Sequence, residues 1–169
     1  LAWDEDLLVT CLDPSVTYYL QVDGSSVTEN LQSGNFTLSL IDNGGSTTVP
    51  YNNDICDAYD FGTIATSETL NNETNECADI EPNEPGIFGF AQHTVWYQFI
   101  APASGRIDVI IDPISILNLF PEVHLYSSST GDCTGTLTQI VYDDLPDING
   151  NAVISTSCIY PGETYFIQL

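Results

Sequence analysis

The chain has 169 residues, 43% of them hydrophobic, and 24 acidic residues stand against one basic residue, Arg106, which gives a formal net charge of −23. That balance excludes nucleic-acid binding, because nothing on the chain can neutralise phosphates, and it disfavours anionic membrane surfaces. Cations, above all Ca²⁺, are the partners that such a surface attracts. High charge of one sign also keeps an extracellular protein soluble, which is the simpler explanation of the acidity.

The hydrophobic content is enough for one good core and hardly for two. No stretch reaches the length of a membrane-spanning helix, so we expect no membrane insertion. The sequence shows no signal peptide, as expected for an internal fragment of a longer chain. Five cysteines and no lysine indicate an oxidising, extracellular or cell-surface setting for a secreted protein.

One sequence pattern occurs twice. Residues 11–22, Cys-Leu-Asp-Pro-Ser-Val-Thr-Tyr-Tyr-Leu-Gln-Val, return as residues 158–169, Cys-Ile-Tyr-Pro-Gly-Glu-Thr-Tyr-Phe-Ile-Gln-Leu. The copies lie about one domain length apart, which indicates a window cut from a tandem array of similar modules. We therefore expect residues 1–41 to be the closing strands of a first module and 42–53 to be a linker. Residues 54–169 should form a second module whose final strand is missing.

Alternation of apolar and polar residues predicts strands throughout, and no segment predicts a helix. Turn sequences separate the strands at a spacing typical of an antiparallel β-sandwich. In chain order, the expected strands cover 16–22, 35–41, 94–100, 106–111, 122–126, 136–142, 152–156 and 163–169. An isolated strand pair is marginal in water, so residues 1–41 should find a sheet upstream in their own chain, in a neighbouring copy, or on residues 54–169.

Several segments follow the order of one known family. They are residues 53–58, the run Val-Trp-Tyr-Gln-Phe-Ile-Ala-Pro-Ala-Ser-Gly at 95–105, and residues 123–126, 131–133, 143–144 and 161–167. The chain resembles the jelly-roll modules akin to bacterial pre-peptidase C-terminal domains. The resemblance implies an all-β jelly-roll sandwich, found in tandem in large secreted and surface proteins and as tails of secreted proteases. The insert at 81–90 departs from the family pattern.

The sequence predicts no active site. His93 lies beside a strand start, and His124 lies within an expected strand with Glu122 on the same face. A catalytic triad would also need a serine on a constrained turn, and no Gly-x-Ser-x-Gly motif occurs. An ordinary strand histidine near a surface glutamate is the simpler interpretation.

The cysteine spacings include no Cys-x-x-Cys, which argues against zinc and for disulfides. Four cysteines, Cys56, Cys77, Cys133 and Cys158, allow three pairings. We expect Cys56–Cys77 and Cys133–Cys158, because each pair flanks one hairpin-like unit. Cys11, the counterpart of Cys158, should then pair with a cysteine outside this sequence.

Calcium is the expected ligand, at a loop with alternating oxygen side chains. Asp147, Asn149 and Asn151 stand at alternate positions around a glycine, and Asp143 and Asp144 precede them. This alternation is typical of loops that wrap a calcium ion. The alternative is an Asp/Asn-rich turn capped by its own side chains.

A second candidate cation site lies at the expected linker, at Asp42, Asn52, Asn53 and Asp54. Hard cations bridge carboxylates from both sides. A cation held between modules would therefore stiffen an array and screen its self-repulsion.

Aromatic residues are predicted mainly for the core. Trp96 should face the opposite side of its strand from Tyr97 and Phe99, and core packing is the simplest role for all three. Phe88 and Phe90, in the Gly-rich insert, are the expected surface hydrophobic residues and hence the candidate contact residues.

These patterns together predict a non-catalytic repeat module of a large secreted bacterial surface protein, acting in adhesion or in filament or stalk assembly. Its expected partners are neighbouring modules or copies of itself, with a surface glycan as a further candidate. The alternative is a carbohydrate- or matrix-binding accessory module of a secreted hydrolase. Residues 1–41 could complete the sheet of a neighbouring copy by strand addition. The simpler case is a polypeptide that runs on at both ends.

Overall fold

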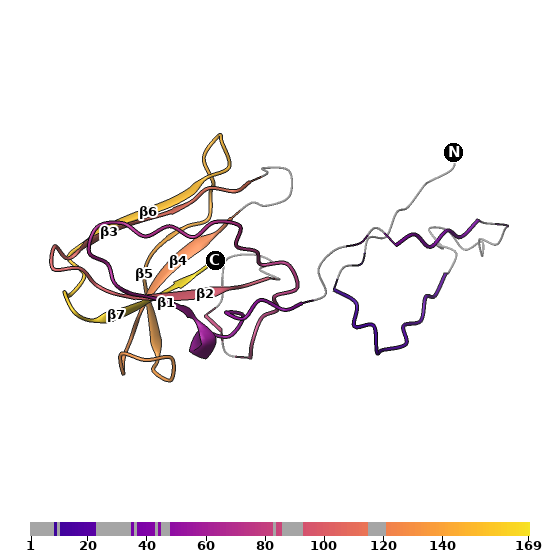
Figure 1. Cartoon of the computed structure of the whole chain (residues 1–169), viewed down its shortest axis with the longest axis horizontal. Coiled ribbons are helices and arrows are strands. Elements are labelled where there is room, and N and C mark those ends of the chain that lie inside the picture. The colour runs from indigo at the N-terminus through magenta and orange to yellow at the C-terminus, as the bar shows by residue number, and fades with distance from the viewer. Residues whose placement is uncertain are drawn as a thin grey trace, which may run out of the picture. The chain divides into compact units, whose positions relative to one another are not determined.

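The computed structural model describes residues 9, 11–22, 35, 37–42, 44, 48–82, 84–85, 93–114 and 121–169. The chain divides into two compact units, residues 1–48 and residues 49–169, and each is described by itself. Every helical turn and strand of the described residues belongs to the second unit (Figure 1). No helix within these ranges is long and apolar enough to span a membrane.

The second unit is an all-β sandwich, which confirms the expected fold class. Its larger sheet has the strand order β1-β2-β7-β4-β5, and β3 pairs with β6 in a second sheet. The strands expected after residue 93 are all present, as β2 to β7. In chain order the elements are the 3-10 turn η1 (Ile55–Asp57), β1 (Tyr59–Thr63), β2 (Trp96–Ile100), β3 (Arg106–Ile111), β4 (Val123–Ser128), β5 (Leu137–Asp143), β6 (Ala152–Ser157) and β7 (Thr164–Gln168).

One pairing departs from the expected antiparallel arrangement. β1 runs parallel to β2, with Tyr59 opposite Tyr97 and Thr63 opposite Ile100. The other strand pairs of the described residues are antiparallel. Parallel neighbours need a long connection, which the chain between β1 and β2 supplies. Local alternation does not encode strand direction, so the sequence pattern missed this feature.

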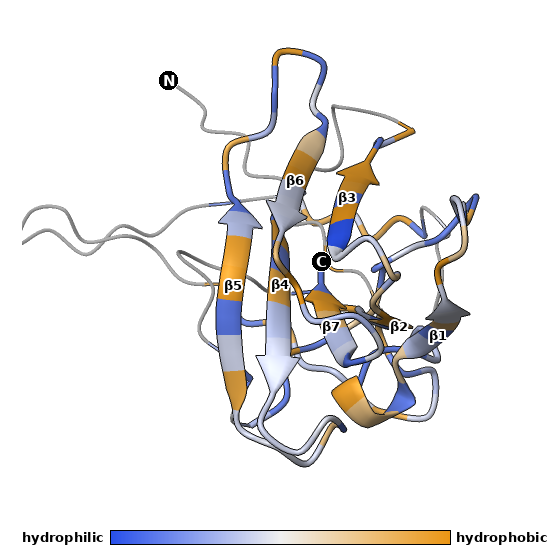
Figure 2. Cartoon of the chain, turned by 90° about the vertical axis from the view of Figure 1, so that its left-hand side faces the viewer, coloured by the Kyte–Doolittle hydropathy of each residue, from blue (hydrophilic) through white to orange (hydrophobic). Residues whose placement is uncertain are grey.

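The main core lies between the two sheets. Tyr97 and Phe99 of β2 and Val123 and Leu125 of β4 contribute from the larger sheet, and Ile154 of β6 contributes from the smaller one. Alternate residues of β3 pack against this cluster. β3 and β6 lie side by side as a separate pair, and β3 is hydrophobic over most of its length (Figure 2). Period-2 alternation thus places one face of each strand in the core.

A second apolar cluster covers the other face of the larger sheet. It consists of Trp96 of β2, Tyr126 of β4 and Phe166 of β7, each at most 1% exposed. Ile55 of η1 and Leu137 of β5 pack against it. Trp96 therefore faces away from its two aromatic neighbours on β2, as the alternation predicted, and all three are buried.

The disulfide pairing differs from the predicted one. Cys56, in η1, is bonded to Cys133, in the loop between β4 and β5, across a sequence separation of 77. Cys11 and Cys77 are disulfide-bonded as well, whereas Cys158 is free and exposed. The expected pairs Cys56–Cys77 and Cys133–Cys158 are therefore wrong, and Cys11 is not the odd cysteine. Cys133 packs, with η1, against the Trp96 cluster, so the fold joins segments that are distant in sequence.

The disulfides indicate an oxidising environment. The Cys56–Cys133 bond also links η1, the first element of the sandwich, to the loop between β4 and β5. In the chain-entropy model, a disulfide that closes a loop of this length stabilises the fold by on the order of 4 kcal/mol.

Residues before the sandwich lie in no strand wherever the structure describes them, although 16–22 and 35–41 show strand patterns. Apolar side chains there are exposed, Tyr19 by 93% and Leu40 by 83%. The second unit begins at Val49, within the expected linker 42–53. Asn52 is 2% exposed, and its side-chain amide donates a hydrogen bond to the carbonyl of Trp96 at 3.0 Å.

Candidate functional site

The loop predicted to bind calcium, between β5 and β6, is closed by its own carboxylates. Asp147 Oδ1 accepts hydrogen bonds from the backbone N–H groups of Asn149 at 2.7 Å and Asn151 at 3.0 Å. Hydrogen bonds, first of all the one from Asn151, lower the pKa of Asp147. Asp143 Oδ2 accepts the N–H of Val153 at 2.8 Å. The loop therefore has the geometry of an Asp/Asn-rich turn capped by its own side chains.

The other two predicted ligands, Asp144 and Asp54, lie near different carboxylates. Asp144 interacts electrostatically with Glu122, and Asp54 interacts with Glu81. No group of three or more His, Cys, Asp or Glu side chains within the described ranges is arranged so that it could hold a metal ion. Calcium binding stays a prediction that rests on the sequence.

Phe88 and Phe90, the predicted contact residues, lie outside the described residues. The insert that contains them is described at 81–82 and 84–85. Two glutamates of this part, Glu81 and Glu84, form polar contacts at the edge of the second apolar cluster.

Glu84 anchors the insert to the larger sheet through neutral donors. Its carboxylate accepts hydrogen bonds from the indole Nε1 of Trp96 at 2.9 Å, the hydroxyl of Thr94 at 3.0 Å and the side-chain amide of Gln168 at 3.3 Å. Gln168 Oε1 in turn accepts the hydroxyl of Tyr126 at 3.0 Å. The network thus joins the insert to β2, β7 and β4. A half-buried carboxylate satisfied in this way fixes a segment in place.

Glu81 lies beside this network but is only partly satisfied by it. Glu81 Oε1 accepts the side-chain amide of Asn53 at 2.7 Å, and the same amide also donates to Asp79 at 2.7 Å. Glu81 Oε2 is buried and accepts no hydrogen bond from a donor in the described part of the chain. Burial, then a hydrogen bond to Glu84, then the charges of Glu84 and Asp54 raise the pKa of Glu81 to about 8. A proton between the two glutamates lets Glu81 donate to Glu84.

This acidic cluster includes Asn53 and Asp54, which the sequence assigned to a linker cation site, but its carboxylates come mainly from residues 79–84. Sequence reasoning treated those residues only as an insert. The available signal was a pair of glutamates three positions apart in a Pro-containing segment. Only the fold reveals that the side chain of Asn53 reaches Asp79 and Glu81. Chemically, the pair can hold a proton near neutral pH.

His124 is buried between two tyrosine rings. Its ring stacks on Tyr142 with centroids 5.4 Å apart and on Tyr126 with centroids 6.2 Å apart. Nδ1 lies 3.3 Å from Gln139 Oε1, and Nε2 lies 4.0 Å from Glu122 Oε2, too far for a hydrogen bond. At 1% exposure, His124 has the surroundings of a packed strand histidine. A general base must instead reach a substrate.

An open cavity of about 370 Å³ lies where β4 ends, beside the turn that precedes β7. Its lining includes Ser127, Ser128, Tyr160 and Glu163, and Tyr160 is 75% exposed. An exposed tyrosine ring flanked by hydroxyl groups and a carboxylate offers both an apolar face and polar partners to a small ligand.

The chain matches no model of a protein family, no curated protein and no solved structure.

Proposed function

We propose that this chain is a non-catalytic repeat module of a large secreted bacterial surface protein, akin to the pre-peptidase C-terminal type, and that it acts in adhesion or in filament or stalk assembly. The observation that carries this proposal is the return of residues 11–22 as residues 158–169. The pattern that includes β7, the last strand of the sandwich, also occurs before the first strand, as expected of similar modules in series. Disulfides and high negative charge suit an extracellular setting.

The polar groups of the sandwich support a structural role. His124 is stacked between tyrosine rings, and the Glu84 carboxylate is used by Trp96, Thr94 and Gln168. Asp147 caps its own turn. These groups stabilise local structure, which supports a structural role for the module.

The Cys56–Cys133 bond favours a role in which the module bears mechanical load. While the bond is intact, the chain between the two cysteines cannot be drawn out by a force applied at the ends. A module in a stalk or an adhesive fibre gains resistance to extension from such a bond.

The proposal is tested with an array of modules in which the sequence repeat continues in register. Because Leu169 corresponds to Val22, each further module is added by repeating residues 23–169 after Leu169. We expect the maximum dimension from small-angle X-ray scattering to grow in proportion to the number of modules, because each contacts only its neighbours. Growth with the square root of that number, as for flexibly joined units, would rule out a stalk.

A second candidate function, carbohydrate or matrix binding as an accessory module of a secreted hydrolase, is favoured by the cavity at Tyr160. Retention on insoluble polysaccharides and a glycan array test this function. In that case Tyr160→Ala should abolish retention, whereas Tyr51→Ala, at a residue that is 61% exposed, should not. If no glycan retains the chain, the structural role is favoured over glycan binding.

A further inference from the structure

The C-terminal copy of the repeat forms a corner that leads the chain into β7. Cys158 has a left-handed backbone with φ 73°, which is uncommon for a residue other than glycine. The carbonyl of Tyr160 accepts the N–H of Glu163 at 3.2 Å, and the N–H of Tyr160 donates to the hydroxyl oxygen of Tyr165 at 3.0 Å. These contacts fix the turn against the strand that follows.

The N-terminal copy forms a corner with the same hydrogen bonds within the first unit, although Ser15 lacks the left-handed backbone of its counterpart Gly162. Cys11 has φ 61°. The carbonyl of Asp13 accepts the N–H of Val16 at 3.0 Å, and the N–H of Asp13 donates to the hydroxyl oxygen of Tyr18 at 2.9 Å. Each contact occurs at the equivalent position of the C-terminal copy. The repeat in sequence is therefore also a repeat in local structure.

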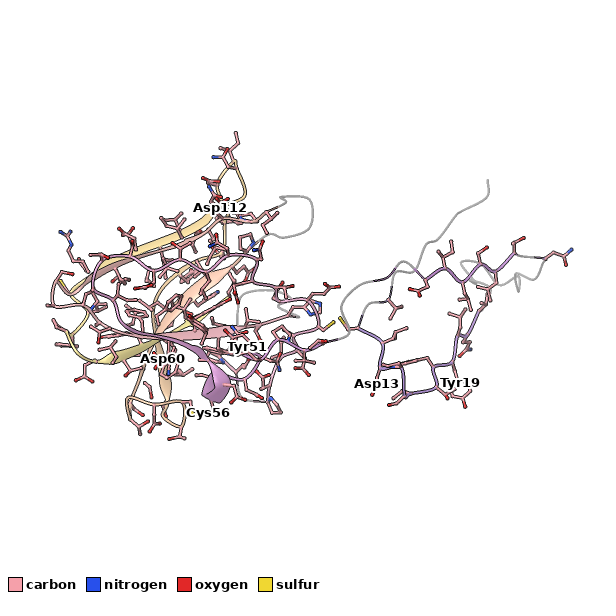
Figure 3. All side chains as sticks on the ribbon, in the orientation of Figure 1. Asp13, Tyr19, Tyr51, Cys56, Asp60 and Asp112 are labelled. Atoms are coloured by element: carbon pink, nitrogen blue, oxygen red, sulfur yellow. A yellow bond between two sulfur atoms is a disulfide. The ribbon has the colours of Figure 1, made fainter. Side chains whose placement is uncertain are left out.

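The segment that follows the corner is buried in one copy and exposed in the other. β7 lies between β2 and β4 and pairs with both, and Tyr165 and Phe166 are 3% and 0% exposed. Their counterparts Tyr18 and Tyr19 are 52% and 93% exposed and lie in no strand. Figure 3 labels Tyr19 on this segment. One face of residues 16–22 is apolar, and the other carries Tyr19 between Thr17 and Gln21, just as β7 carries Phe166 between Thr164 and Gln168.

We propose that residues 11–22 are the closing strand of a second β-sandwich of the same type, and that they bind in its larger sheet between the strands equivalent to β2 and β4. The inference rests on the proposed function, because it requires another module of this kind. Tyr18 and Leu20 would face the main core of that module, and Tyr19 would face its second apolar cluster, as the alternation in β7 dictates.

Gln21 specifies the partner further. Its counterpart, Gln168, is 0% exposed, donates to the Glu84 carboxylate at 3.3 Å and accepts the Tyr126 hydroxyl at 3.0 Å. A primary amide needs both kinds of partner once it is buried. The partner module therefore presents a carboxylate beside the slot and a hydroxyl on the neighbouring strand.

An intact second copy of this chain does not fit this role. Its slot is filled by its own β7, which pairs with β2 from Trp96–Gln168 to Ile100–Thr164 and with β4 on the other side. The partner is a sandwich in which that slot is open, and the intact chain is expected to be monomeric.

The test places the sequence of residues 11–22 at positions 158–169 of the full chain. At the centre of β7 this graft keeps Tyr165 and Gln168 and makes only the changes Phe166→Tyr and Ile167→Leu. We expect a cooperative thermal transition with Tm lowered by roughly 5–15 °C, because the changes in β7 largely conserve shape. The loss comes from Gly162→Ser at φ 86° and from the hydroxyl that Phe166→Tyr buries.

The matched control is the same graft with Leu20 and Gln21 exchanged, which keeps the composition and the corner. It places an amide in the main core and a leucine in the polar network, so it should lose the cooperative transition. The inference is overturned if the first graft does not fold or if both grafts melt alike. Because neither result depends on an array, a failure here is distinguishable from a failure of the scattering test.

Sedimentation of the intact chain at high concentration tests the choice of partner. A monomer is expected. A dimer that Leu20→Glu abolishes would overturn the inference by making an intact copy the partner.

Discussion

The carboxyl pair of Glu81 and Glu84 couples the stability of the sandwich to pH. Burial, followed by contact with Glu84 and nearby negative charge, raises the pKa of Glu81 from 4.5 to about 8. Between these values the folded state holds a proton that the unfolded chain has released, so the free energy of unfolding falls as pH rises. We expect Tm to decrease from about pH 5 to pH 8 and then to level off. Burial also raises the pKa of Glu122, which adds to the same trend.

Thermal melts of Glu81→Gln across this range check the assignment. The amide keeps the shape of the side chain but cannot ionise, so the variant should lose most of the pH dependence and be more stable than the parent at pH 8. Glu68→Gln, at an exposed position, is the matched control and should retain the full dependence. An unchanged slope in Glu81→Gln would show that the two glutamates do not share a proton.

Cys158 is the reactive thiol of the native chain. It is free and exposed, whereas the other four cysteines are in disulfides. We therefore expect one maleimide adduct per native chain by intact mass, none in Cys158→Ser, and five after reduction and unfolding. Two or more adducts on the native chain would show that at least one of the other four cysteines is not in a disulfide.

At this scale, local features were predictable and pairings were not. The Asp147 turn appeared in the sequence as one of two alternatives, because Asp and Asn cap nearby backbone groups by themselves. The partner of Cys56 depends on which loop the sheet order brings next to η1, and no local pattern contains that information.

At the scale of elements, alternation predicted β2 to β7 because one face of each strand is buried. It missed β1, whose sequence Tyr-Asp-Phe-Gly-Thr contains residues that disfavour strands. Pairing with β2 and packing of Tyr59 and Phe61 on the main core hold β1 in place. Residues 16–22 show the converse, since a good strand pattern forms no strand where no neighbouring strand is provided.

The corner before β7 gives a prediction for one hydrogen bond. Tyr165 is 3% exposed, and its hydroxyl accepts the N–H of Tyr160. Tyr165→Phe removes this bond and keeps the ring, so the free energy of unfolding should fall by about 1 kcal/mol. Urea denaturation measures the change. Tyr160→Phe, at a residue that is 75% exposed, should have no measurable effect. Equal free energies of unfolding for the two variants would show that the Tyr165 hydroxyl does not stabilise the corner.

At the scale of the whole molecule, charge is the dominant property. A net charge of −23 on 169 residues produces self-repulsion that any salt relieves. Stabilisation by Ca²⁺ therefore indicates a specific site only where it exceeds the effect of other cations at equal ionic strength.

The loop from Asp143 to Asn151 predicts such an excess. Its carboxylate and amide oxygens suit the six to eight oxygen ligands of Ca²⁺, so Ca²⁺ should raise Tm above the values in Mg²⁺ and NaCl at matched ionic strength, and a chelator should reverse the difference. Asp147→Asn removes the charge at the centre of the turn and should abolish the excess while leaving the salt response. Asp132→Asn is the matched control, because Asp132 caps another exposed turn through Thr130 and Thr134. If Ca²⁺ and Mg²⁺ act equally on the parent chain, the carboxylates of this loop serve only to close it.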